Sequence, residues 1–271
     1  MDIFSPQIIL LTLVMGSFAG FLAGLLGIGG GVILVPLFLW LFSIVGFPPD
    51  LIVHTAFGTS LAIILPTAIS STFAHRKRGN VDWHMVAFLA LGGVFGSLLG
   101  SSAAAVIPGE KLKMYFGLMQ ILISLKLLFY KPYIPPENLA RAKKTSLALV
   151  GFAGGLYSAF FGVGGGVVAV PLMLMVLHLP IHLAVGNSSA LIVVSSFSAV
   201  ICYIWYGMQN ASSPPFSFGY VNMLVAVLVA PLTMIFARIG VKFATRTSQT
   251  KLVKIFAVLL MLVGIKILLK M

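Results

Sequence analysis

The sequence predicts an all-α polytopic membrane protein with two inverted repeats of about five helical segments, each starting with a glycine-broken helical hairpin. Three observations carry this prediction. First, 60% of the 271 residues are hydrophobic and only 8% are charged. Second, no Asp, Glu, Lys or Arg occurs in residues 3–49 or in residues 145–237, and runs of that length exceed the core of a soluble domain of this size. Third, one glycine cluster inside apolar sequence occurs twice.

Ten apolar segments follow one another along the chain, five in each half. They cover residues 8–26, 32–45, 51–73, 83–106 and 111–130, then 146–161, 167–178, 182–206, 219–237 and 251–269. We expect helices, because lipid-exposed backbone must satisfy its own hydrogen bonds and these runs do not alternate as barrel strands do. The predicted repeats are therefore 1–130 and 145–271, with a cytoplasmic linker at 131–144.

Two blocks align the halves. Residues 27–37, GIGGGVILVPL, return as residues 162–172, GVGGGVVAVPL, with eight of eleven positions identical at an offset of 135. Residues 54–62, HTAFGTSLA, align with residues 182–190, HLAVGNSSA, at an offset of 128. Helices broken at matching places in two membrane repeats are typical of transporters, which place binding sites at such breaks.

Basic residues give the expected orientation. Three clusters stand in short loops, at residues 76–78, 131–144 and 238–251. Since cytoplasmic loops carry the excess of Lys and Arg, we place all three inside, and the N-terminus, which has no basic residue before Arg76, outside. This orientation requires each glycine-containing pair of segments to be a hairpin with both ends on the same side of the membrane. One half then starts outside and the other inside, so the repeats are inverted.

Segment lengths bear on these hairpins. Segments 146–161 and 167–178 would be about 24 and 18 Å long as helices, shorter than a hydrocarbon core of about 30 Å. Segment 8–26 is long enough to cross, so two depths stay open for the first hairpin: fully crossing or re-entrant.

The glycine clusters are the first candidate site. Consecutive glycines let the backbone leave the helix and present N–H groups together, and new helices should start at Val32 and Val167. Helix N-termini and glycine-rich nests attract anions without a charged side chain, which suits a membrane interior. The alternative is that glycine only allows close helix packing. The candidate residues are Gly29, Gly30, Gly31, Gly164, Gly165 and Gly166.

Polar side chains in the second aligned block form the next candidate set, with Thr59 and Ser60 in one half and Asn187 and Ser188 in the other. Helical rise places Thr59 about 13 Å and Asn187 about 10 Å into the membrane. Hydroxyls and amides at that depth can donate hydrogen bonds to an oxyanion. The alternative is hydrogen bonding between helices, which is common for Ser, Thr and Asn in membranes.

Two histidines occupy equivalent positions, His54 and His182. Either can carry a proton coupled to anion movement or charge a gate; the alternative is an interfacial polar residue near a helix end. A different feature, the four-residue spacing of Gly92, Gly96 and Gly100, predicts close helix packing.

Several function classes have no support in the sequence. The net charge of +12 suggests nucleic acid, but the basic residues sit in short loops between apolar segments, so we expect no nucleic-acid partner. The single cysteine, Cys202, excludes an internal disulfide and a cysteine-based metal cage. Paired carboxylates, a nucleophile beside a base, and metal-ligand spacing are all missing from the sequence, so we expect no enzyme, catalytic residue, metal or cofactor.

The two duplicated blocks resemble the TauE/SafE family of sulfite and organosulfur-anion permeases over nearly the whole chain. The resemblance implies a multi-pass protein of a bacterial or archaeal inner membrane that moves sulfite, sulfonates such as sulfoacetate, or related small anions, often outward. It carries the ten residues of the two candidate sets over as anion ligands. Because the family has mixed substrates, the motifs do not select one anion.

The resulting expectation is a secondary transporter, and an exporter, that alternates access around a central anion site of backbone N–H, Ser, Thr and Asn groups. Its partners would be a small anionic substrate and the lipid bilayer; the oligomeric state is left open. Two alternatives remain: a passive anion channel that uses the same site, and a non-transport membrane protein, such as an assembly factor, whose glycines only pack helices.

Overall fold

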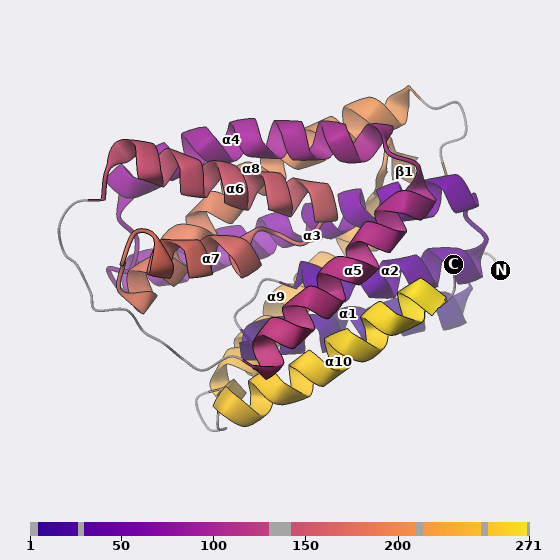
Figure 1. Ribbon diagram of the computed structural model, residues 1–271. Helices are drawn as coiled ribbons and strands as arrows, with labels where there is room; N and C mark the ends of the chain where they lie inside the picture. Colours follow the sequence, from indigo (N-terminus) through magenta and orange to yellow (C-terminus); the bar gives the residue numbers. More distant parts are fainter. Residues whose placement is uncertain (1–4, 27–29, 130–141, 210–213, 245–248, 270–271) are drawn as a thin grey trace.

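The computed structural model describes residues 5–26, 30–129, 142–209, 214–244 and 249–269, which form ten helices and one short two-stranded ribbon (Figure 1). The first five helices are α1 (Pro6–Leu26), α2 (Gly31–Val45), α3 (Pro49–Lys77), α4 (Trp83–Val106) and α5 (Gly109–Leu128). The next three are α6 (Lys144–Phe161), α7 (Gly166–Met175) and α8 (Ile181–Met208). The ribbon, β1 (Ser217–Phe218) and β2 (Val221–Asn222), precedes α9 (Met223–Ala244) and α10 (Gln249–Leu269).

The predicted fold class is confirmed: the chain is an all-α membrane protein. Within the described residues, α3, α4, α8 and the Met223–Gly240 part of α9 are long and apolar enough to cross a bilayer. In contrast, α7 has 10 residues and is therefore about 15 Å long, half of a hydrocarbon core of about 30 Å. The division into inverted repeats stays a prediction.

The sequence prediction was wrong about the start of α9. Helix was expected from residue 219, but α9 starts at Met223 because a ribbon turns through Gly219, which has a φ of 59°. Phe218 pairs with Val221, and Ser217 pairs with Asn222. Asn222 then caps the N-terminus of α9, because its side-chain Oδ1 accepts a hydrogen bond from the N–H of Val225 at 3.0 Å.

Other helix ends also differ from the prediction, and α9 continues to Ala244, seven residues further than expected. Helix α7 ends at Met175, three residues early, and the chain then passes through His178 at a φ of 50°. Helix α3 continues to Lys77, four residues further than expected. Arg76 and Lys77 therefore stand in the last turn of α3, where basic side chains complement the negative end of the helix dipole.

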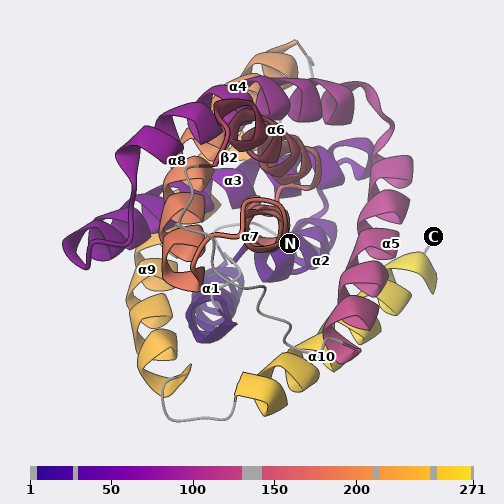
Figure 2. The same ribbon diagram turned by 60° about the vertical axis from the view of Figure 1, so that its left-hand side comes forward.

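Helix packing follows the alignment of the two halves. Helix α4 of the first half packs along α6 of the second half, and α9, the counterpart of α4 in the predicted repeats, packs along α1 of the first half. The pairs α3–α8 and α5–α10 join equivalent helices of the two halves. In Figure 2, α4, α5, α9 and α10 lie around the outside of the bundle, with α2 and α7 inside.

The predicted glycine stripe is confirmed as a packing surface. A Cβ on Gly92, Gly96 or Gly100 of α4 would overlap backbone carbonyl oxygens of α6. Those carbonyls, of residues 148, 152 and 156, repeat with the same four-residue spacing. Small residues thus bring α4 and α6 to backbone contact, as is usual between membrane helices.

Candidate functional site

The second glycine break is a sharp reversal between α6 and α7. Gly162, Gly164 and Gly165 have φ values of 69°, 73° and 40°, a region that residues with a side chain rarely adopt. The N–H groups of Gly162 and Val163 both donate to the carbonyl of Ser158, which closes the end of α6. The break therefore depends on glycine at three of its four positions.

Free backbone N–H groups gather where α7 begins. The carbonyl of Gly165 accepts hydrogen bonds from Val168 and Ala169 at 3.0 and 2.8 Å, which starts the helix. Across the described part of the chain, the N–H groups of Gly164 and Gly165 have no hydrogen-bond partner. Unpaired N–H groups at a helix N-terminus carry the positive end of the helix dipole, so this position favours an anion.

The first glycine break lies against the second. Gly29 falls outside the described residues, while Gly30 caps α2 and Gly31 is its first residue. A Cβ on Gly31 would lie 2.5 Å from the Cα of Val163 and 2.7 Å from the Cδ1 of Ile64. Glycine is therefore required at Gly31 by this close approach, and the predicted helix starts, at Val32 and Val167, are each one residue late.

A glutamine holds the first turn of α2. Pro36 has no N–H, so it cannot pair with the carbonyl of Val32 one turn earlier. The side-chain Nε2 of Gln120, on α5, donates to that carbonyl at 2.9 Å. The buried polar group left by Pro36 is thus satisfied, and the helix start beside the glycine break is fixed in place.

Ser60 and Ser188 occupy equivalent places beside the breaks. On α3, Phe57 lies against the second break at Gly162, and Ile64 lies against both breaks. Ser60 lies on the same face of α3, three residues after Phe57 and four residues before Ile64. On α8, Ser188 precedes by one turn Ile192, which lies near Gly164. Both hydroxyls are buried and have no hydrogen-bond partner in the described structure.

Thr59 and Asn187, the neighbours of these serines, hold the loops of the opposite half. The N–H of Asn222 donates to the Oγ1 of Thr59 at 2.9 Å. Equivalently, the N–H of Asp82 donates to the Oδ1 of Asn187 at 2.8 Å. We call these contacts the Thr59 latch and the Asn187 latch. They match the alternative of hydrogen bonding between helices, because each oxygen already has a partner.

Glycine lets each latch close. A Cβ on Gly58 would overlap the carbonyl oxygen of Tyr220, and one on Gly186 would overlap that of Asn80. The loop backbone therefore lies directly against the helix in both places. In Figure 1 the α3–α4 connection lies at the left-hand end of the bundle and β1 lies at the right-hand end, so the latches secure loops at opposite ends.

The two histidines share an alignment position but not an environment. His54 is buried, with Nδ1 3.2 Å from the carbonyl oxygen of Asp50 and Nε2 3.1 Å from those of Ala104 and Ile107. Its ring also stacks on Tyr220, with centroids 5.0 Å apart. His182 is exposed near the start of α8. Thus His54 ties the start of α3 to the end of α4, whereas His182 does not have this role.

Sequence reasoning missed two further serines, Ser158 and Ser196, whose hydroxyls are buried without a partner in the described structure. The Cβ of Ser158 would lie 3.2 Å from a Cβ on Gly165, which places it at the second break. At the offsets that align the halves, these serines correspond to Ala23 and Ala68. Alignment of the two halves identifies polar residues that both halves share, so it could not identify Ser158 and Ser196, which are polar in one half only.

Apolar helices long enough to cross a bilayer, glycine breaks that meet, and unpaired buried donors beside them are typical of a helical membrane protein of the transporter class. Comparisons with known proteins agree. A family model described as "Sulfite exporter TauE/SafE" matches residues 12–267. The chain therefore belongs to the TauE/SafE sulfite exporter family.

Curated relatives carry the same class of name. The chain is 31% identical over 264 residues to a "Probable membrane transporter protein" of Haemophilus influenzae, with 97% of this chain and 98% of the relative covered. It is 28% identical over 272 residues to the "Probable membrane transporter protein YunE" of Bacillus subtilis, with 93% and 94% covered. A Methanocaldococcus jannaschii relative is 28% identical, with 89% and 88% covered. No solved structure matches the chain significantly.

Proposed function

We propose that the chain is a secondary transporter, and an exporter, that carries a small sulfur-containing oxyanion such as sulfite or a sulfonate across a cell inner membrane, which it crosses several times. The observation that carries the proposal is the pair of buried, unpaired hydroxyls of Ser60 and Ser188 beside unpaired glycine N–H groups. Leaving a buried donor unpaired costs about 1–3 kcal/mol. A bound oxyanion would remove that cost for several donors at once.

The donor set suits a small oxyanion. Ser60, Ser158 and Ser188 would donate from their hydroxyls, and the second break would donate from the N–H groups of Gly164 and Gly165. The starts of α2 and α7 add the positive ends of two helix dipoles. Sulfite and sulfonate groups offer three acceptor oxygens each, so a set of neutral donors can bind them without a buried cation.

Two latches support alternating access around this site. In the predicted arrangement of inverted repeats, 1–130 and 145–271, the Thr59 latch holds an outer loop and the Asn187 latch holds an inner loop. With both closed, the serines are shielded from both sides, and opening one latch would expose the site to one side. The burial of Ser60 and Ser188, at 0% and 2% exposure, favours such a carrier over an open channel.

The test is transport by purified protein in liposomes, using sulfite and sulfoacetate. We expect Ser60→Ala and Ser188→Ala each to raise the half-saturating anion concentration about tenfold, as loss of one hydrogen bond of about 1.4 kcal/mol predicts. The double variant should lose saturable transport and counterflow. Ser198→Ala is the matched control, because that hydroxyl on α8 donates to its own helix at Val194.

Anion-dependent thermal stabilisation in detergent gives an independent readout. Wild type and Ser198→Ala should be stabilised by the transported anion, and the double serine variant should not. Transport and stabilisation that are unchanged in the folded double variant would overturn the proposed site. Anion flux without saturation or counterflow would identify a channel, and neither flux nor stabilisation in wild type would favour a non-transport role.

A further inference from the structure

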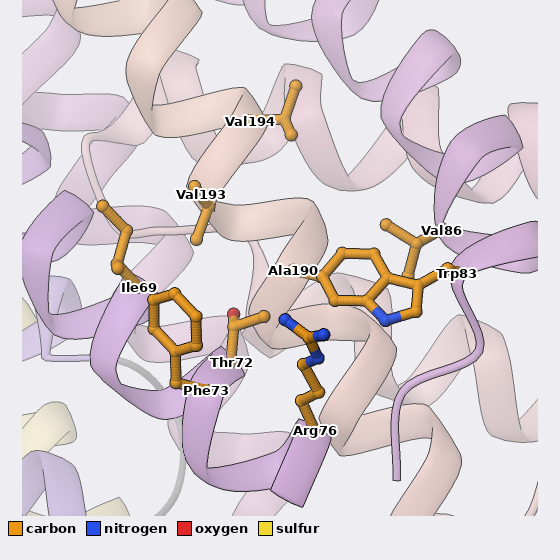
Figure 3. Close-up of a pocket in the computed structure, with 9 residues that line it drawn as sticks. All are labelled: Ile69, Thr72, Phe73, Arg76, Trp83, Val86, Ala190, Val193 and Val194. Carbon is orange, nitrogen blue, oxygen red and sulfur yellow. The ribbon is translucent and has the colours of Figure 1, made fainter. Parts of the chain in front are cut away.

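An apolar cavity of about 300 Å³ lies between α3, α8 and the start of α4, away from the glycine breaks (Figure 3). Its wall is almost entirely aliphatic and aromatic, with Ile69 and Phe73 from α3 and Val193 and Val194 from α8. The hydroxyl of Thr72, which also lines it, already donates to the carbonyl of Ala68 at 2.8 Å. The cavity therefore offers an anion little hydrogen bonding from its walls, and its surface suits hydrocarbon.

The cavity opens on a surface that faces lipid. Ile69 and Phe73 are 39% and 56% exposed, and Trp83 at the mouth is 52% exposed. They belong to α3 and α4, and both helices are long and apolar enough to cross a bilayer. Exposed apolar side chains on such helices face acyl chains, and a tryptophan at a helix start is typical of the membrane–water interface.

One cation stands at the end of the cavity. The Arg76 guanidinium carbon lies 5.9 Å from the centroid of the Trp83 ring, and both side chains line the cavity. Figure 3 shows the guanidinium directed toward the cavity between Phe73 and Trp83. Lys77 and Arg78 follow at the end of α3. The nearby carboxylate of Asp82 accepts from the N–H groups of His84 and Met85, which caps α4.

We propose that this cavity is a binding site for an anionic phospholipid, with an acyl chain between α3 and α8 and the headgroup phosphate on Arg76. A lipid combines the two chemistries that the site presents, an apolar body and one negative charge at the membrane surface. Basic pockets between membrane helices on the cytoplasmic side bind acidic headgroups in this way. A small hydrophilic anion would use the arginine but leave the apolar walls without a partner.

The test measures lipid binding to the full-length chain, purified in detergent and stripped of lipid. Dioleoyl phosphatidylglycerol and dioleoyl phosphatidylcholine are added separately, and bound lipid is counted by native mass spectrometry alongside thermal unfolding. We expect phosphatidylglycerol to bind more tightly and to raise the unfolding temperature more. Arg76→Gln should weaken phosphatidylglycerol binding about fivefold, the contribution of one basic residue near an acidic surface, and weaken phosphatidylcholine binding less, because the choline cation neutralises the phosphate charge of that lipid.

Two further variants make the test specific. Lys77→Gln is the matched control, since Lys77 lies in the same helical turn but does not line the cavity; it should keep the lipid preference. Val193→Trp should fill the cavity and remove both lipids, whatever happens to the charge. Equal binding of the two lipids by wild type, or an unchanged preference in both Arg76→Gln and Val193→Trp, would overturn the proposal.

Other occupants give distinct results. Glycerol phosphate that stabilises the protein as well as the full lipid would show a headgroup site without an acyl chain. A lipid-free dimer that Val193→Trp dissociates would show that a second copy covers the cavity. Either result would overturn the lipid proposal, and neither depends on which anion the protein transports.

Discussion

Replacing Thr59 by valine removes one latch while keeping the shape of the side chain. Thr59 is fully buried, and its Oγ1 accepts the N–H of Asn222 at 2.9 Å. Valine cannot accept, so this backbone donor loses its partner at a cost of about 1–3 kcal/mol. If opening the loop returns the donor to water, the closed state alone loses this energy. The ratio of open to closed molecules then rises about 5- to 150-fold.

Thiol labelling measures this opening. In a Cys202→Ala background, a Ser60→Cys reporter beside the latch is treated with a membrane-impermeant maleimide added from outside. Thr59→Val should raise the labelling rate at least about fivefold. Thr72→Val is the control on the same helix, because the Thr72 hydroxyl donates only to its own helix at Ala68. Equal labelling rates in the two variants would refute the reasoning that the Thr59 latch holds the closed state.

Three other predictions follow from the packing. Gly96→Val should separate α4 from α6 and lower the free energy of unfolding by about 1–3 kcal/mol, measured by chemical denaturation in detergent; a stability equal to wild type would contradict the stripe. Gln120→Leu should leave the carbonyl of Val32 unpaired and destabilise by about 1–3 kcal/mol in the same assay; a stability equal to wild type would show that the carbonyl does not need this donor. His54→Leu should lower the thermal unfolding temperature, because it removes the hydrogen bond that joins α3 to α4. His182→Leu, at an exposed position, should change the free energy of unfolding by less than about 0.5 kcal/mol. Equal effects of the two substitutions would contradict the difference in environment.

The helix pattern was predictable because it is local. Apolar runs, the glycine breaks and the prolines that begin α3 and α8 all act within a few residues, so the predicted segments overlap every observed helix. The ribbon before α9 was missed because its six residues include Ser217, Phe218 and Val221, which fit an apolar helix as well as a strand. Only the positive φ of Gly219 and the pairing across it decide between them.

The candidate site was predictable in part. Repetition pointed to the glycines, and Ser60 and Ser188 proved to be unpaired beside the breaks. The partners of Thr59 and Asn187 were not predictable, because each latch joins residues more than a hundred positions apart. Sequence alone gives the depth of a polar side chain in a helix, but the neighbour that satisfies it depends on how the halves pack.

The reciprocal latches also set an order for biogenesis. Thr59 is synthesised 163 residues before Asn222, and Asp82 is synthesised 105 residues before Asn187. At about 5–20 residues per second, Thr59 waits about 8–30 s for its partner. During that interval α3 is in the membrane without the loop that later covers it, so the first half stays incomplete. The first half therefore completes its packing only when the second half arrives, and a chain that ends between α5 and α8 lacks the partner of Thr59.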